Sequence, residues 1–313
     1  MTKDRPLLGI LLMLMFCLLA PIGDAVAKLL SGQIPLCELL TVRFGVQAII
    51  LAPVIYMTGR SWRMSRRVLW LTGLRTVLHI VGIGAMFSAL YYLPLADAVA
   101  IAFVMPFLML LLGKYVLNEE VGARRLIACV VGFAGTLLVI QPSFATVGWP
   151  ALLPLVVAVV FSLFMLVTRQ IAMETDPISL QAVSGVMATV MILPFLAYNA
   201  SEGLSNLTIV KPGLQVGLLL AVVGLLGTLA HLVMTWALRY APSATLAPMQ
   251  YLEIPFATLI GWIVFGDLPN ELAALGIAIT MAAGLYIVVR ERANVRRSEE
   301  APSLSGPIPT PAE

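Results

Sequence analysis

The sequence predicts an all-α membrane protein of ten transmembrane helices, arranged as two inverted five-helix repeats. The chain of 313 residues is 60% hydrophobic and only 11% charged, less than half of the charge that a soluble domain usually carries. Its apolar residues fall into ten segments, each long enough to cross the hydrocarbon core of a bilayer as a helix. The two halves of the chain also resemble each other.

The ten apolar segments are separated by polar breaks with turn or charge signals, such as 58–60 and 267–270. In chain order the predicted spans are 7–27, 36–57, 68–91, 97–117, 124–141, 149–169, 178–197, 214–238, 243–265 and 271–290. Ala25-Val26-Ala27 resembles a signal-peptide cleavage site, but the apolar run before it is long for such a peptide, so we expect it to remain as the first helix. Residues 291–313 are polar and then rich in Pro and Ser, which predicts a disordered tail.

The distribution of basic residues predicts the orientation. If the N-terminus is cytoplasmic, all but four of the 19 lysines and arginines lie in inner segments or at inner helix ends; the four are Lys28, Arg43, Arg75 and Lys211. Basic residues concentrate on the cytoplasmic side of membrane proteins. We therefore expect both termini to be cytoplasmic, and the compact chain with its short loops suggests a bacterial inner membrane.

The two halves share local sequence as well as length. Residues 89–94 (ALYYLP) match 237–242 (ALRYAP) at four of six positions. Other corresponding positions are Pro106 with Pro255, the acidic turn at Glu119 with Asp267, and Lys28 with Arg169. Because five spans per half is an odd number, the second repeat (149–290) must enter the membrane from the side opposite to the first (5–143). Inverted repeats are the usual construction of secondary transporters, with the substrate between the repeats near the midplane.

Several motifs resemble a known family. Residues 91–98 (YYLPLADA), 118–120 (NEE) and 131–135 (VGFAG) are similar to the first repeat of the drug/metabolite transporter superfamily, and 253–256 (EIPF) and 265–267 (FGD) to the second repeat of its EamA type. The likeness covers about residues 5–290. It implies a ten-helix bundle with a central cavity that carries a small metabolite or drug, and the branch it most resembles contains bacterial riboflavin importers.

The chain departs from the family pattern at two positions. The second repeat has no evident counterpart of Arg43, and Ile254 separates Glu253 from Pro255 where an acidic–proline pair is common. These departures concern the polar lining of the cavity.

The predicted function is that of a secondary transporter that moves a small metabolite by alternating access, with riboflavin or a related vitamin as the substrate that the resemblance suggests. The alternatives are an exporter of amino acids or drugs, and a channel or lipid scramblase. No enzymatic motif, cofactor-binding motif or Walker-type loop is present, the three cysteines are too far apart for a metal site, and the basic residues do not form a nucleic-acid-binding patch. Protons are a candidate coupling ion.

Charged residues within spans are costly and usually face a cavity or a partner. Asp24 and Lys28 are four residues apart on one helix face, which fits either an intrahelical ion pair or a role in the cavity. Arg75 and His79 also share a face, and could hold an anionic or hydrogen-bonding substrate; the alternative is that Arg75 reaches to the inner surface. Arg43 lies deeper in the second span.

Glu253 is the sharpest candidate, because it lies mid-span, two residues before Pro255. An isolated carboxyl group in an apolar environment tends to hold its proton, and alternate protonation is what proton coupling requires. We therefore expect Glu253 or Asp24 to couple protons or to orient the substrate. Asp97 is expected to cap the helix that starts near it.

Further predictions concern helix shape and packing. Pro106 and Pro255 are expected to kink their helices, unless they are merely tolerated there. Glycines at 132, 135, 224 and 227 are expected to allow close helix packing. Further candidates for the cavity lining are Tyr91, Tyr251, Gln47, Trp236 and His231, although a lone membrane histidine is more often a hydrogen-bond partner between helices.

Overall fold

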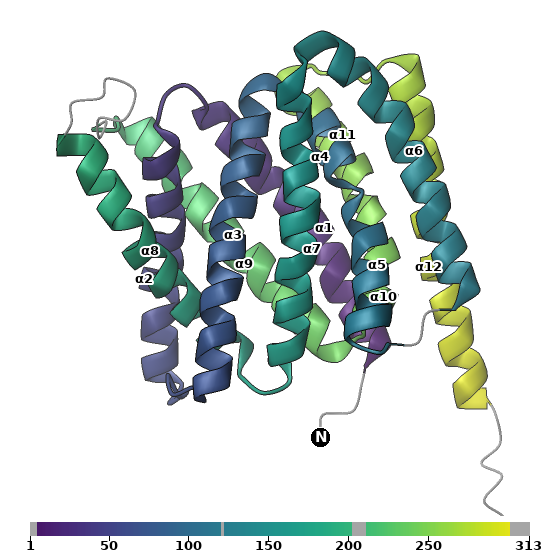
Figure 1. The fold of residues 1–313 in the computed structure, drawn as a ribbon, viewed down its shortest axis with the longest axis horizontal. Coiled ribbons are helices and arrows are strands. Elements are labelled where there is room, and N and C mark those ends of the chain that lie inside the picture. Colours follow the sequence, from purple (N-terminus) through teal and green to yellow (C-terminus); the bar gives the residue numbers. More distant parts are fainter. Residues whose placement is uncertain (1–4, 120–121, 202–210, 301–313) are drawn as a thin grey trace, which may run out of the picture.

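The computed structural model describes residues 5–119, 122–201 and 211–300, and all regular secondary structure within these ranges is helical (Figure 1). The helices of the first half are α1 (Pro6–Leu30), α2 (Leu36–Met57), α3 (Arg66–Tyr92), α4 (Leu95–Ala102), α5 (Met105–Val116) and α6 (Ala123–Val147). The second half consists of the short 3-10 helix η1 (Trp149–Leu152), α7 (Leu153–Ala172), α8 (Pro177–Ser201), α9 (Leu214–Tyr240), α10 (Ser243–Leu246), the 3-10 helix η2 (Ala247–Leu252), α11 (Glu253–Phe265) and α12 (Glu271–Glu300).

Seven helices in the described part of the chain are long and apolar enough to cross a membrane. They are Pro6–Leu30, Leu36–Met57, Arg66–Tyr92, Leu95–Val116, Trp149–Ala172, Pro177–Ala197 and Leu214–Tyr240. Shorter apolar helical stretches cover Leu126–Leu138 in α6 and Glu271–Tyr286 in α12. The sequence thus predicts the positions of these helices correctly, with ends that differ by a few residues.

The fourth span of each half is interrupted. Phe103 and Val104 separate α4 from α5, and η2 separates α10 from α11. Pro106 and Pro255 both lie in the first turn of the helix that follows the interruption, where a missing backbone N–H needs no partner. Each span is therefore broken into separate helices, whereas the two prolines predicted a kink within one continuous helix.

Helices of the two halves pack against each other in reciprocal pairs. α1 packs on α9 and α3 on α7, while α2 packs on α8 and α6 on α12. In the order of the repeats, α7, α8, α9 and α12 of the second half correspond to α1, α2, α3 and α6 of the first. Exchanging each helix for its counterpart gives the same set of pairs. In Figure 1, α1 begins and α12 ends at the lower edge of the view, whereas α7 begins at the upper edge. We call the lower edge the terminal face and the upper edge the opposite face.

Glycines allow the closest of these helix contacts, as the sequence predicts. A Cβ atom on Gly135 of α6 would lie 2.7 Å from the carbonyl oxygen of Gly276 in α12. A Cβ atom on Gly132 would lie 2.5 Å from the phenol ring of Tyr251. On α9, Gly224 makes room for Val46 in the same way. Both glycine pairs therefore pack against a neighbouring helix.

The C-terminal prediction is wrong in part. The helix α12 extends to Glu300, ten residues past the expected end of the last span. The extension is rich in Glu and Arg, which are good helix formers, so polarity alone does not end the helix. The rest of the predicted tail, 301–313, lies outside the described residues.

Candidate functional site

A cavity lies between the two halves of the bundle. Its walls come from α1, α2, α3, α4, α5, α7, α9 and α11 and are mostly apolar. The aromatic and sulfur-containing lining residues are Phe16, Met86, Phe87, Phe103, Met105 and Phe161. The cavity has a volume of about 80 Å³, which is room for a few water molecules. A molecule of vitamin size therefore requires the cavity to widen.

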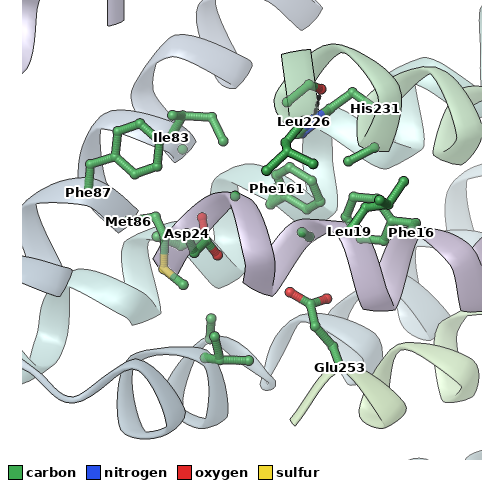
Figure 2. A pocket seen from close by; sticks show the side chains of 18 of the residues that line it. Phe16, Leu19, Asp24, Ile83, Met86, Phe87, Phe161, Leu226, His231 and Glu253 are labelled. Carbon is green, nitrogen blue, oxygen red and sulfur yellow. Dashed lines mark hydrogen bonds between the residues drawn. The ribbon is translucent and has the colours of Figure 1, made fainter. Parts of the chain in front are cut away.

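Four groups give the apolar cavity its polar character: Asp24 on α1, Arg43 on α2, His231 on α9 and Glu253 on α11. Figure 2 shows the carboxyl group of Glu253 directed toward α1, the helix that carries Asp24. Glu253 is only 8% exposed. The described residues provide no hydrogen-bond partner for either carboxyl group, so both are free to bind a ligand.

Arg43 is held by contacts from α9 and from its own helix. Its Nη2 lies 3.1 Å from Nδ1 of His231, and its guanidinium lies 4.9 Å from the centre of the Phe44 ring. A Cβ atom on Gly227 would be 2.9 Å from the guanidinium carbon, so a side chain at this position would displace the guanidinium. Nδ1 of His231 also lies 3.0 Å from the carbonyl oxygen of Gly227, so it either accepts from Arg43 or donates to that carbonyl. The other ring nitrogen is Nε2. That atom and Nη1 of Arg43 have no partner among the described residues.

A second polar layer lies between the cavity and the terminal face. The ring of His79 is 4.3 Å from that of His231, centre to centre, and neither of its nitrogens has a partner in the described structure. Arg75 lies one turn before His79 on α3, on the side of the terminal face. Its guanidinium is fully buried and donates to side chains of α7, α8 and α9. Its acceptors are Thr168 at 2.8 Å, Ser184 at 2.8 Å, Gln181 at 2.7 Å and Thr235 at 3.4 Å. Arg75 therefore does not reach the inner surface, and neither it nor His79 lines the cavity here.

Asp24 and Lys28 do not form the intrahelical ion pair that was one of two expectations. Asp24 faces the cavity, whereas Nζ of Lys28 lies 3.6 Å from Asp267 and donates to the carbonyl of Leu93 at 2.8 Å. Asp97 is not the N-cap residue either, because α4 begins at Leu95 and the N-cap position is Pro94. Because of Pro94, the helix starts at Leu95, two residues before the predicted start at residue 97. The Asp97 carboxylate therefore lies in the first turn, where its negative charge interacts favourably with the helix dipole.

The two candidate tyrosines lie away from the cavity. Tyr91 is 62% exposed and lines a separate hollow near Gly32 at the opposite face, which shares Phe87 with the cavity. Tyr251 is fully buried, donates to the carbonyl of Cys129 at 3.1 Å and packs on α6. Of the remaining candidates, Gln47 donates to the carbonyl of Gln181 at 2.6 Å, and Trp236 packs against a small apolar cluster.

Sequence reasoning missed an ion pair that joins the two halves near the terminal face. Arg169 lies 3.5 Å from Glu119. Glu119 also accepts hydrogen bonds from Oγ and N of Ser243 and from N of Ala244, at 2.6, 3.1 and 2.8 Å. Lys28 and Asp267 are the counterparts of Arg169 and Glu119 in the repeat alignment. The signal that could have predicted the two ion pairs was therefore the correspondence of these charged residues.

Comparison with known proteins identifies the family. A model of the EamA-like transporter family matches residues 7–141 and again residues 148–290. The chain belongs to the EamA-like transporter family. The resemblance to the drug/metabolite transporter superfamily is thereby confirmed, and the all-helical bundle is that of a multi-pass membrane transporter with two EamA repeats.

Relatives of this EamA protein have different named substrates. A riboflavin transporter of Rhizobium johnstonii is 30% identical over 71% of this chain and 71% of its own length. An S-adenosylmethionine uptake transporter of Rickettsia felis is 23% identical over 89% of this chain and 92% of its own length. A crystal structure of a protein with 19% sequence identity aligns with a TM-score of 0.69 over 90% of this chain and 96% of that one, which shows the shared fold.

Proposed function

We propose that this protein is a secondary transporter that carries riboflavin or a related small metabolite across the membrane by alternating access. The observation that carries the proposal is the cavity between the two repeats, which combines aromatic walls with a few charged groups. Such a lining is typical of small-molecule sites, where apolar surface supplies affinity and a few polar groups fix orientation. The riboflavin transporter relative supports this choice of substrate.

We infer a topology of ten spans in two inverted repeats, 5–143 and 149–290, with both termini in the cytoplasm of a bacterium. The seven long apolar helices, the apolar stretches of α6 and α12, and the interrupted α10–η2–α11 segment add up to this number. The ends of α1 and α12 on one face support a common side for the termini. The basic residues near that face favour the cytoplasm.

The cavity lining suits a flat aromatic heterocycle with polar edges. Phe16 and Phe161 stack with their ring centres 6.4 Å apart, and Phe87 and Phe103 contribute further aromatic surface. Offset or edge contacts between aromatic rings add about 0.5–1.5 kcal/mol beyond the burial of their area. Asp24, Arg43 and Glu253 would then hydrogen-bond the carbonyl, imide and hydroxyl groups of the ligand.

Alternating access is supported by two equivalent ion pairs at opposite ends of the cavity. Each joins a basic residue on the first helix of one repeat to an acidic residue at the end of the fourth span of the other. We call Arg169–Glu119 the terminal lock and Lys28–Asp267 the opposite lock. Arg60–Asp176 and Arg67–Glu174 pairs also join the two repeats at the terminal face. In the proposed cycle, one lock opens while its counterpart closes.

Asp24 and Glu253 are the candidate groups for proton coupling. Both face the cavity without a hydrogen-bond partner in the described structure, and Arg43 faces the same space. A carboxyl group that releases its proton when the site opens to one side and regains it on the other would couple transport to a proton gradient.

Ligand-induced thermal stabilisation of the detergent-purified protein tests the substrate. The panel contains riboflavin, S-adenosylmethionine, amino acids and nucleotide derivatives. A ligand at one hundred times its Kd stabilises a protein by about 2.7 kcal/mol, which a melting assay detects. We expect riboflavin to raise the melting temperature, and to do so less in a Phe161→Ala variant. Stabilisation by another compound alone would refute riboflavin as the substrate, and flux that does not saturate would favour the channel or scramblase alternative.

A further inference from the structure

We propose that Arg75 and the polar side chains around it form an anion site on the terminal side of the cavity, which takes a carboxylate or phosphate group. The proposal deepens the proposed function, and rests on it only for the role of the site in transport. The site is distinct from the cavity, because Arg75 does not line it. Its residues come from α3 of the first repeat and from α7, α8 and α9 of the second.

The first argument is the charge of Arg75. The guanidinium is fully buried and lies nine residues from the start of α3, about 13 Å along the helix. All four of its hydrogen-bond acceptors are neutral. Of the acidic groups described near the terminal face, Glu174 pairs with Arg67, Asp176 with Arg60 and Glu119 with Arg169. A buried intramembrane cation without an acidic partner is costly, and usually marks a substrate or ion pathway.

The second argument is the state of the four acceptors. The hydroxyl groups of Thr168 and Thr235 donate their protons to the carbonyls of Phe164 and His231, at 2.7 Å each, so only their lone pairs face Arg75. The hydroxyl of Ser184 donates to no described group, and Nε2 of Gln181 is buried without a partner. Ser184 and Gln181 can therefore turn from accepting to donating. An anion that replaced them at the guanidinium would receive hydrogen bonds from Arg75 and from both of them.

The third argument is the connection to the cavity. Between Arg75 and the cavity-lining His231 lies His79, whose two nitrogens are buried and unpaired in the described structure. Oε1 of Gln47, one turn past Arg43 on α2, is also unpaired. Unpaired buried polar groups cost about 1–3 kcal/mol each. A polar path that fills when the bundle opens toward the terminal face explains why a chain so rich in apolar residues keeps them.

The position between the repeats gives the site its place in the cycle. Arg75 moves with the first repeat, and its acceptors move with the second. A rearrangement that opens the terminal face separates the guanidinium from Ser184 and Gln181 and leaves it open to an anion. The anion can be an acidic group of the transported molecule or a free anion bound beside it, because both present the same oxygens to Arg75.

The test is thermal stabilisation of the purified protein by matched ligands. The probes are riboflavin and riboflavin 5′-phosphate, and sodium phosphate and sodium acetate alone, at constant ionic strength. Wild-type protein is expected to melt at a higher temperature with at least one anionic probe. Arg75→Gln is expected to bind that probe at least tenfold more weakly, whereas the control Arg66→Gln removes an exposed charge of the same helix and keeps the response.

The comparison of probes separates the sources of the anion. Stabilisation by the phosphate ester beyond that by riboflavin assigns the anion to the transported molecule, and equal stabilisation by inorganic phosphate assigns it to a free ion. The absence of any anion response in wild-type protein, or an unchanged response in Arg75→Gln, overturns the proposal. Riboflavin itself can fail in this assay, which refutes the proposed substrate, without affecting the anion result.

A second variant keeps the test valid if Arg75→Gln does not fold. Ser184→Asp places a carboxylate beside Arg75 and supplies the missing anion from the chain itself. We expect this variant to melt at a higher temperature than wild type and to lose the response to anions, while the isosteric control Ser184→Asn retains it. A Ser184→Asp variant that responds to phosphate as wild type does would contradict the proposed site.

Discussion

At the scale of single residues, the position of Arg43 depends on the absence of a side chain at Gly227. A methyl group there would meet the guanidinium at 2.9 Å, so Arg43 would have to move away from His231. We expect Gly227→Ala to weaken substrate binding about tenfold without changing any charge of the site. Binding is measured by titration of the purified protein with riboflavin.

Gly217→Ala is the matched control, because it lies on the same helix with open space around its Cβ position. Alanine favours a helix over glycine by about 1 kcal/mol, so this variant should be at least as stable as wild type and bind normally. Equal binding by both variants would show that Arg43 is not a ligand-binding group in this position.

Glu253 provides a second prediction at this scale. If its carboxyl group carries the coupling proton, Glu253→Gln loses the dependence of net uptake on pH, because an amide cannot exchange that proton. Exchange of substrate for substrate needs no net proton movement and should persist. Uptake by Glu253→Gln in proteoliposomes at the wild-type rate with unchanged pH dependence would exclude this role and leave Asp24→Asn as the variant to examine.

The sequence predicts which residues lie at the depth of the cavity within a span, but not the direction in which each side chain points. Asp24, Arg43, His231 and Glu253 were candidates for the cavity because a charged or polar side chain within a span must avoid lipid, although an ion pair was the alternative for Asp24 and an interhelical hydrogen bond for His231. Arg75 and His79 were candidates on the same ground, and they do not line the cavity. Tyr251 lies at a similar depth and packs on α6 instead. An aromatic ring is equally stable in a cavity wall and in a helix interface, so its residue type does not distinguish the two.

At the scale of helices, α6 and α12 form a pair that depends on small residues. A side chain at Gly135 would collide with backbone of α12 at Gly276, which cannot rotate away. Overpacking of this kind costs about 1–3 kcal/mol, so Gly135→Ala should melt at a lower temperature than wild type. Gly45→Ala, in α2 with nothing near its Cβ position, is the control and should not be destabilised. Equal melting temperatures would show that α12 packs differently.

Hydrophobic pattern predicts the helices well because each uninterrupted span is one continuous apolar run. The interruptions at Phe103–Val104 and at η2 were not predicted in full, because a proline in an apolar run is compatible with a kink or a break. Only packing against neighbouring helices decides between the two. The helical residues 291–300 were missed for the opposite reason, because a polar helix has no apolar face to reveal it.

At the scale of the whole molecule, the two locks should control opposite sides of the cavity. Glu119→Gln removes the ion pair of the terminal lock, and Asp267→Asn removes that of the opposite lock. A cysteine at Gly23, where a Cβ atom fits without strain in the cavity wall, can report access to charged thiol reagents. The background carries Cys37→Ser, since Cys37 is partly exposed.

We expect Glu119→Gln to increase labelling of this cysteine from the side of the termini, and Asp267→Asn to increase it from the other side. The ratio of the two labelling rates should therefore move in opposite directions in the two variants. A change in the same direction in both would contradict the assignment of the locks to opposite ends of the cavity. The repeat in the sequence predicts that such counterparts exist, but only the folded chain shows that they pair across the repeats.

The most direct test of the account is counterflow of labelled riboflavin in proteoliposomes that contain the purified protein. A carrier with one cavity open to alternate sides predicts saturable uptake of the label, accelerated by unlabelled riboflavin inside and reduced in Phe161→Ala. Flux that rises linearly with concentration and ignores the riboflavin inside would contradict alternating access through this cavity.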